Sequence, residues 1–248
     1  MTRKKTNRIV LILFVAALAV FLFAAVKLGT IFFGYYKEDS AYKELEAFAD
    51  FEEEQPAEEG TLYHSPIDFE SLLAINQETI AWIHFETMEI NYPIVQGTDD
   101  DYYLHHGFYK EENKCGCIFM DTQSKADFSS ENSFIYGHNM KNKSMFAKLN
   151  QYTDPAFYAE HTDFLIYTPT GIRRYKIYSC YPAELDWDSF TYAFENRDDY
   201  AKWQETVKGY SLYDTGITPD SSHNTVTLMT CTPKGSSYRF LVHGIQVE

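Results

Sequence analysis

Thr225-Val226-Thr227-Leu228-Met229-Thr230-Cys231, followed by Thr232-Pro233-Lys234-Gly235, is the most informative stretch of this sequence. β-Branched and apolar residues fill its first part, a composition typical of a strand. Pro233 and Gly235 then end the strand, because proline has no N–H for a sheet and glycine favours turns. We therefore expect Cys231 at the rim of a sheet, where its sulfur meets solvent while its backbone is held.

Similar runs of strand-forming residues surround this stretch, and the 20 Tyr and 19 Phe of the chain also favour strands. The predicted strands are residues 80–85, 90–95, 116–120, 133–136, 163–168, 172–181, 225–231 and 238–247. Eight strands with few helices between them predict a mainly β fold, a closed or nearly closed barrel. Pro93 indicates an edge or a bulge in the second strand. A helix predicted at residues 198–209 has Tyr200, Trp203 and Val207 on one face.

The N-terminal segment predicts a membrane anchor. Residues 9–26 are all apolar, and at about 1.5 Å per residue a helix of this length approaches the thickness of the hydrocarbon layer. A cleaved signal peptide is the alternative, although its apolar region usually runs over only about 7–15 residues. Basic residues precede the segment and acidic residues follow it, which predicts a single-pass protein with a cytoplasmic N-terminus and the rest of the chain outside the cell membrane.

Four regions follow from these patterns. We expect a basic cytoplasmic tail at 1–8, a transmembrane helix at 9–28, an acidic stalk at 29–64 and a barrel domain at 65–248. Within the stalk, Tyr42, Leu45 and Ala49 have helical spacing, and the Glu-rich part around Pro56 is typical of a solvated linker. Residues 68–76 predict a further short helix.

Charge and cysteine spacing exclude several classes of protein. The net charge of −15 argues against nucleic acid as a partner, because binding phosphates requires clustered Lys and Arg. The cysteines form no Cys-x-x-Cys pair and no zinc-finger spacing, so we expect no metal and no cofactor. Cys115, Cys117 and Cys180 are expected to be small buried hydrophobic residues.

Cys231 would need a partner to react, because a free thiol is only a few per cent thiolate at neutral pH. His138 follows a predicted strand in the turn Gly137-His138-Asn139, where Gly137 would permit a sharp turn, although seven other histidines compete. Arg239 begins the last strand and faces away from Tyr238 and Phe240, so it must pair with another group or line a cleft. Spacing alone does not show that the three meet, and a lone cysteine at a strand end is more often structural than catalytic.

The combination of these residues resembles a known family. Thr227-Leu228-Met229-Thr230-Cys231, followed eight residues later by Arg239, resembles the sortase signature Thr-Leu-x-Thr-Cys with its downstream Arg. Tyr136-Gly137-His138-Asn139-Met140 resembles the His segment of class B sortases. The likeness covers about residues 75–247 and is weakest over 153–224. Further similar segments, in chain order, are Ala81-Trp82-Ile83, Asn91-Tyr92-Pro93-Ile94-Val95-Gln96-Gly97, Asp101-Tyr102-Tyr103-Leu104, Ile118-Phe119-Met120-Asp121 and Ser144-Met145-Phe146.

The resemblance implies an eight-stranded sortase barrel and a cysteine transpeptidase. Cys231 would be the nucleophile, His138 the proton-transfer residue and Arg239 the oxyanion donor. The enzyme would cleave secreted proteins at a C-terminal sorting motif of the form x-Pro-x-Thr followed by Gly or Asn, and would join them to an amine of a peptidoglycan precursor or of another protein. The candidate substrate-binding residues are Thr230, Met229, Asn139 and Trp203, and the helix at 198–209 would form one wall of the peptide groove.

Departures from the pattern and alternative functions remain. Class B sortases often have a small hydroxyl residue where this chain has Met229, and an acidic residue where it has Thr232, which leaves the sorting motif open. Water could be the main acceptor, which would make the protein a peptidase. A catalytically inactive, membrane-tethered binding domain is a further alternative. Papain-like and L,D-transpeptidase motifs are absent from the sequence.

Overall fold

The computed structural model describes residues 3–51 and 63–247, and the chain divides into two compact units, Met1–Ala41 and Tyr42–Glu248. The described part of the first unit lies within helix α1 (Arg3–Leu45). In this helix Leu11–Thr30 is long and apolar enough to cross a membrane, with a mean hydropathy of 2.8. The helix continues well past the predicted anchor, into the region expected to be a stalk. The predicted linker around Pro56 lies outside the described residues.

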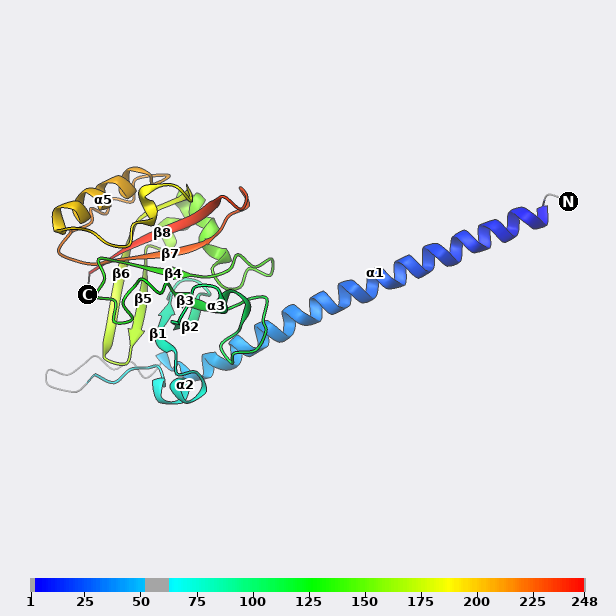
Figure 1. The fold of residues 1–248 in the computed structure, drawn as a ribbon, viewed down its shortest axis with the longest axis horizontal. Helices are drawn as coiled ribbons and strands as arrows, with labels where there is room; N and C mark the ends of the chain where they lie inside the picture. Colours follow the sequence, from blue (N-terminus) through cyan, green and yellow to red (C-terminus); the bar gives the residue numbers. More distant parts are fainter. Residues whose placement is uncertain (1–2, 52–62, 248) are drawn as a thin grey trace. The chain divides into compact units, whose positions relative to one another are not determined.

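The second unit contains a closed eight-stranded barrel (Figure 1), which confirms the predicted fold class. Its strands run in the order β1-β2-β3-β4-β7-β8-β6-β5, and β5 closes the barrel onto β1. Two neighbouring pairs, β2/β3 and β4/β7, are parallel, and the other pairs are antiparallel. The strands are β1 (Thr79–His84), β2 (Asn91–Val95), β3 (Ile118–Met120), β4 (Asn132–Tyr136), β5 (Asp163–Thr168), β6 (Gly171–Glu184), β7 (Thr225–Cys231) and β8 (Tyr238–Gln246).

Three strands differ from the prediction in a way that has a local cause. β3 begins two residues later than expected, because Gly116 has φ +59° and the N–H of Cys117 donates to the carbonyl of Tyr103. β6 extends three residues further, because its end pairs with β8. β2 is not an edge strand, although it contains Pro93: this residue pairs only with Trp82 on β1 and precedes the two pairs that join β2 to β3.

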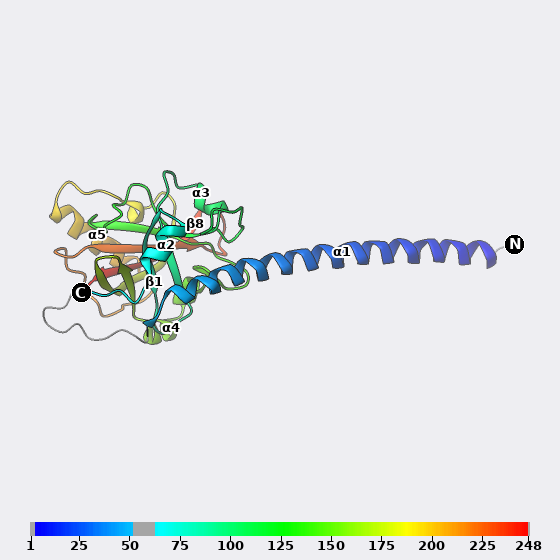
Figure 2. The same cartoon turned by 90° about the horizontal axis from the view of Figure 1, so that it is seen from below.

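Short helices connect the strands, and side-chain caps fix the ends of several of them. Asp68 accepts a hydrogen bond from the N–H of Ser71 and begins α2, while Asn196 accepts from the N–H groups of Asp198 and Asp199 and begins α5. Figures 1 and 2 show α5 on one side of the barrel, along β8 and β7. The helices of this unit are η1 (Glu46–Phe48), α2 (Phe69–Ile75), α3 (Tyr102–His105), η3 (Ala147–Thr153), α4 (Pro155–Glu160), η4 (Asp188–Phe190) and α5 (Arg197–Gly209).

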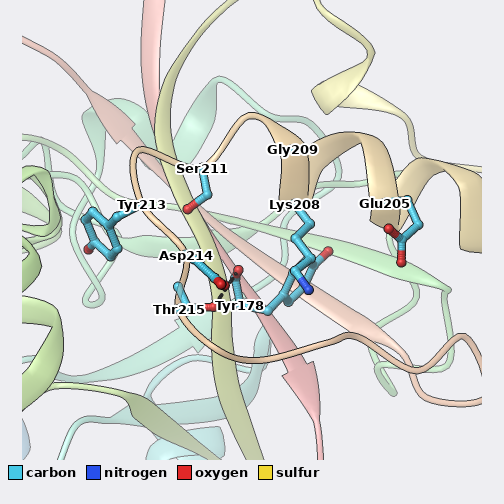
Figure 3. A pocket seen from close by; sticks show the side chains of 8 residues that line it. All are labelled: Tyr178, Glu205, Lys208, Gly209, Ser211, Tyr213, Asp214 and Thr215. Atoms are coloured by element: carbon cyan, nitrogen blue, oxygen red, sulfur yellow. Dashed lines mark hydrogen bonds between the residues drawn. The ribbon is translucent and has the colours of Figure 1, made fainter.

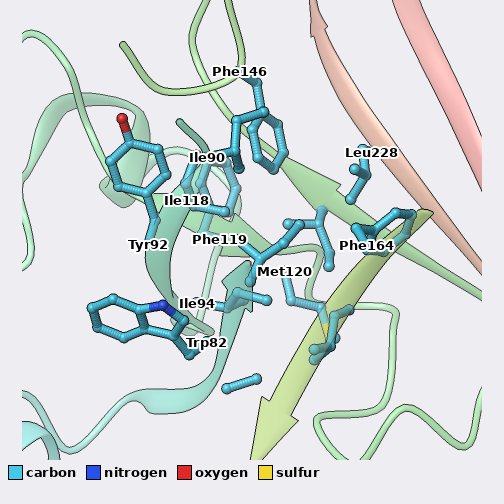
Figure 4. Packing of buried hydrophobic residues seen from close by; sticks show 14 of the residues in the cluster. Trp82, Ile90, Tyr92, Ile94, Ile118, Phe119, Met120, Phe146, Phe164 and Leu228 are labelled. Carbon is cyan, nitrogen blue, oxygen red and sulfur yellow. The ribbon is translucent and has the colours of Figure 1, made fainter. Parts of the chain in front are cut away.

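The main core fills the barrel with aliphatic and aromatic side chains. Figure 4 shows Leu228 of β7 and Met120 of β3 in this packing, with Phe164 of β5 and Ile94 of β2. Because side chains alternate across a strand, the neighbours of Leu228, including Met229, face outward. The end of β7 therefore directs Cys231 to the outer surface of the barrel.

A second core lies between α5 and the outer face of the barrel. Trp203 and Val207 of α5 pack there with Tyr181 of β6 and Leu241 of β8. Phe240, the neighbour of Leu241, belongs instead to the main core. This alternation places Arg239 on the outer face together with Leu241, as the sequence predicted, and hence on the same face as Cys231.

Candidate active site

Cys231 is the last residue of β7 and the exposed one of the four cysteines. The chain turns away after it, since Pro233 cannot donate to a sheet and the N–H of Lys234 bonds to Oγ1 of Thr232 at 2.9 Å. The other three cysteines are free and buried. Burial raises the pKa of Cys117 to about 12 and that of Cys180 to about 11, so both remain thiols at neutral pH.

Arg239 lies directly opposite Cys231 in the antiparallel pair of β7 and β8. Its Nη1 donates to the carbonyls of Ser236 (2.8 Å) and Tyr238 (2.9 Å), which fastens the half-exposed guanidinium to the β7–β8 connection. A guanidinium has five N–H donors, so these two bonds leave Nη2 and Nε for an anionic group near the thiol.

His138 lies on the other side of Cys231, at the end of β4. Tyr136 pairs with Met229 in the parallel ladder of β4 and β7, and the N–H of Gly137 donates to the carbonyl of Met229 at 3.1 Å. β4 ends at Tyr136, and His138 follows two residues later, directly before Asn139, whose side chain bonds to the carbonyl of Cys231. Cys231 is flanked by the predicted proton-transfer residue on one side and the predicted oxyanion donor on the other.

The imidazole of His138 is oriented by a backbone carbonyl. Nε2 lies 2.8 Å from the carbonyl oxygen of Leu104, which can only accept, so Nε2 carries a proton. In the neutral ring Nδ1 then has the unprotonated lone pair. The carbonyl of His138 accepts from the N–H of Phe146 at 3.1 Å, which holds the backbone after β4.

Gly137 is needed for close packing and not for a sharp turn, which corrects the expectation from the sequence. Its φ is not among the positive values, which among glycines occur at Gly116, Gly216 and Gly235. A Cβ at Gly137 would lie 2.5 Å from Cδ1 of Ile118 and 2.6 Å from Cγ of Phe146. Any side chain there would displace the segment that carries His138.

The four candidate substrate-binding residues have different surroundings. Asn139 lies beside the site, and its Nδ2 donates to the carbonyl of Cys231 at 2.9 Å. Met229 is half-buried against the core under α5. Thr230 points into the barrel and is 2% exposed, and its Oγ1 has no hydrogen-bond partner among the described residues. Trp203 is not brought to the site: its indole is buried under α5 and donates to the carbonyl of Asp188 at 2.9 Å, because it anchors the helix.

The sequence did not reveal that Tyr136, two residues before His138, forms a hydrogen-bonded pair with Tyr192. Tyr136 donates a hydrogen bond to the carboxylate of Asp121, and its hydroxyl lies 2.9 Å from that of Tyr192. Burial raises the pKa of Tyr192 to about 12, so its phenol remains a donor at neutral pH. Tyr136 and Asp121 belong to segments that resemble class B sortases, whereas Tyr192 lies in residues 153–224, where this resemblance is weakest.

A buried histidine ties the segment before Tyr192 to the barrel. Nδ1 of His243 lies 2.9 Å from Oγ1 of Thr227, whose own hydrogen goes to Oδ1 of Asn132 at 2.7 Å, so the ring donates to the hydroxyl. Nδ2 of Asn132 in turn donates to the carbonyl of Thr191 at 3.1 Å. The chain of hydrogen bonds thus crosses β8, β7 and β4 and ends on the segment next to the site.

The other nitrogen of this ring leads back to the same segment. Nε2 of His243 lies 3.0 Å from the hydroxyl of Tyr181, which is 2.8 Å from Oγ of Ser189. Burial lowers the pKa of His243 to about 3, so the ring is neutral at neutral pH. Residues 189–191 are therefore fastened at both ends to one network, which we call the His243 network.

Two further features lie away from these residues or concern metal ligands. A polar hollow of about 390 Å³ lies between the end of α5 and residues 211–215 (Figure 3), and Glu205, Lys208 and Asp214 line it, so it does not include Cys231, His138 or Arg239. Among the described residues no group of three or more His, Cys, Asp or Glu side chains is placed to hold a metal ion. The Asp99 carboxylate instead accepts from the N–H groups of Asp101 and Tyr102 in a turn.

Comparison with known proteins gives a consistent result. Residues 83–247 match the family described as the sortase domain. Sortase B of Listeria monocytogenes is 33% identical over 166 residues, which cover 66% of this chain and 67% of that protein. Sortase B of Staphylococcus aureus is 29% identical over 168 residues, or 68% and 69% of the two chains.

Solved structures show the same similarity. The crystal structure of sortase B from B. anthracis in complex with AAEK1 superposes with a TM-score of 0.76 at 30% identity, over 88% of this chain and 99% of that one. The Staphylococcus aureus sortase B–substrate complex gives a TM-score of 0.76 at 25% identity, over 87% and 99% of the two chains.

Proposed function

Because the chain belongs to the sortase family, as a class B member and thus a cysteine transpeptidase, we propose that Cys231 is its nucleophile, His138 its proton-transfer residue and Arg239 its oxyanion donor. The observation that carries this proposal is the position of Cys231. It is exposed at the end of β7, pairs with Arg239 on one side and receives a hydrogen bond from the residue after His138 on the other.

The reaction follows from these positions. The proton of the Cys231 thiol passes to Nδ1 of His138, which gives a thiolate and an imidazolium. The thiolate attacks the carbonyl carbon of a peptide bond, and Arg239 donates hydrogen bonds to the oxyanion that forms. His138 gives a proton to the leaving amine as the C–N bond breaks, which leaves a thioester on Cys231. A second amine then attacks the thioester, His138 takes its proton, and the thiolate leaves as the new amide forms.

The substrates are sorting signals and amines, as in the family. We propose that the scissile bond follows the Thr of an x-Pro-x-Thr motif, with Gly or Asn after it, near the C-terminus of secreted proteins. The acceptor is an amine of a peptidoglycan precursor or of another protein. Retention of acyl energy in the thioester lets an amine compete with water when the site is partly dry.

The N-terminal helix supports a location at the membrane. Leu11–Thr30 has the length and composition of a membrane span, and Arg3, Lys4, Lys5 and Arg8 precede it. We propose that the basic end is cytoplasmic and that the barrel lies outside the cell, where secreted proteins and wall precursors are found.

The test is the fate of a sorting-motif peptide in the presence of triglycine. We expect the purified enzyme to convert the peptide to the triglycine amide and only a minor part to the free acid, as measured by mass spectrometry. Cys231→Ala is the control and should give neither product while keeping its melting temperature. Free acid alone, at every triglycine concentration, would favour the peptidase alternative, and turnover by Cys231→Ala would exclude Cys231 as the nucleophile.

A further inference from the structure

The carbonyl of Cys231 accepts hydrogen bonds from two side-chain amides. Nδ2 of Asn139 donates to it at 2.9 Å and Nδ2 of Asn150 at 3.1 Å. A carbonyl oxygen has two lone pairs, so these two donors satisfy it fully. The donors come from different parts of the chain, 92 and 81 residues away from Cys231.

Asn139 takes the place of the next backbone donor in the sheet. In the parallel ladder of β4 and β7, the N–H of Gly137 donates to the carbonyl of Met229. The next donor position along β4 is residue 139, and the next acceptor along β7 is Cys231, because parallel ladders advance by two residues. β4 ends at Tyr136, however, and Asn139 instead forms a bridge with Met145, so the amide side chain makes the bond to Cys231.

This substitution lets His138 leave the sheet without loosening the nucleophile. A regular continuation of β4 would keep the backbone beside β7, with the side chains in a fixed pleat. The observed path bonds the carbonyl of His138 to Phe146 and its Nε2 to Leu104, while Asn139 still reaches Cys231. Asn139 thus links the two residues, because it follows His138 in the chain and its side chain bonds to the backbone carbonyl of Cys231.

Asn150 adds a second support from a rigid element. It lies in η3, which the buried side chains of Leu149 and Tyr152 anchor in the core. Its own carbonyl accepts from Oγ1 of Thr153 at 3.0 Å. The donor is therefore held before any substrate arrives, which is the condition for precise placement of a reactive group.

We propose that Asn139 and Asn150 are positioning residues that hold the carbonyl of Cys231 and so keep its sulfur in register with His138. This inference rests on the proposed roles of Cys231 and His138. In this inference the amide of Asn139 supports the nucleophile and does not bind the substrate. Small displacements at a reacting centre are costly, since a misplacement of about 1 Å can lower the rate by roughly a hundredfold.

The test combines peptide kinetics with the reactivity of the thiol. Asn139→Ala and Asn150→Ala should each lower kcat by about tenfold, with KM changed less than about twofold. The double variant should lose more kcat than the product of the two single losses, because in each single variant the other amide still holds the carbonyl. Alkylation of Cys231 by iodoacetamide should become slower in the double variant and lose its dependence on His138. Gln151→Ala is the matched control, since Gln151 is the exposed neighbour of Asn150 and its side chain makes no hydrogen bond within the described residues.

Several outcomes would overturn the inference. The first is a double variant with the wild-type kcat and alkylation rate, and the second is a change confined to KM. The third is a loss of activity that only parallels a lower melting temperature. If an alanine variant does not fold, Asn139→Asp or Asn150→Asp keeps the shape and replaces the donor by an acceptor, and unchanged kcat there is equally decisive against it. Turnover by Cys231→Ala would instead remove the proposed function, so the two failures are distinguishable.

Discussion

Arg239 uses some of its N–H groups to fix its orientation and keeps others for a further hydrogen bond. Nη1 is used on the carbonyls of Ser236 and Tyr238, which fixes the plane of the guanidinium. The same division occurs at His138, where Nε2 bonds to Leu104 and Nδ1 makes no hydrogen bond within the described residues. In both residues one nitrogen sets the orientation, and the remaining groups can act on a substrate.

Arg239→Lys should therefore lower kcat/KM for a sorting peptide by roughly a hundredfold, the usual cost of losing an oxyanion donor. An ammonium group cannot bond two carbonyls in one plane and also present a fixed donor to the oxyanion. Steady-state kinetics at saturating triglycine measures the effect. Arg197→Lys, which changes an arginine that bonds to Ser221 and Asn224, is the control. Near-normal kinetics of Arg239→Lys would make Arg239 a structural residue.

At the scale of elements, the long connection between β6 and β7 is fastened to the barrel in two ways. Trp203 and Val207 of α5 fill an apolar layer over β6 and β8. Residues 189–191 are held by the His243 network, which is polar and buried. The segment that ends in Tyr192 is thus fixed beside Tyr136, and its position depends on a histidine that remains neutral.

This histidine predicts how stability depends on pH. Its pKa is about 3 in the folded protein and about 6.5 when unfolded, so between these values the unfolded chain binds one proton more. Stability should fall as pH decreases from 6.5 towards 3, with His243 contributing up to about 1.4 kcal/mol per pH unit. The groups around the ring are Thr227, Tyr181 and other uncharged side chains.

Urea unfolding of the barrel unit at several pH values between 4 and 7 measures this slope. His243→Gln should lower the slope of the unfolding free energy against pH by about 1.4 kcal/mol per pH unit, which corresponds to one proton. This holds whatever the effect of the substitution on stability at neutral pH. His64→Gln, at an exposed position, is the matched control. An identical slope in wild type and His243→Gln would show that His243 is not the group that titrates.

At the scale of the whole molecule, the division between the two units lies within α1. Tyr42 and Leu45, in its last turn, belong to the barrel unit and are buried. The hydroxyl of Tyr42 bonds to the carbonyl of Gly116 and lies 3.3 Å from Sγ of Cys117. The end of the helix is therefore part of the folded barrel unit, and a soluble fragment should include it.

Leu45→Ala, in a fragment of residues 40–248, should lower the free energy of unfolding by about 2–4 kcal/mol, as for other fully buried leucines. A fragment of residues 63–248 should be less stable still, since it lacks Tyr42 as well. Chemical denaturation measures both effects. Glu44→Ala changes an exposed neighbour and should have little effect. Equal stability of the two fragments would mean that the helix end does not contribute to the barrel unit.

The sequence by itself determined the strands, the helices at α2 and α5, and the face that Arg239 shares with Leu241. These features depend on local alternation of apolar residues and on side chains that bond to their own backbone neighbours, so spacing along the chain is sufficient to predict them. The motifs around Cys231 and His138 also identified the family, although they did not show that the two residues meet.

Only the tertiary structure decided what surrounds Cys231. The parallel register of β4 and β7 brings Asn139 to its carbonyl, and the position of η3 brings Asn150. Trp203, expected at the substrate, was buried instead, because the apolar face of a helix packs on the nearest apolar surface. Register and helix docking are set by closure of the whole barrel, and contacts between residues about 80 or 90 positions apart leave no periodic trace in the sequence.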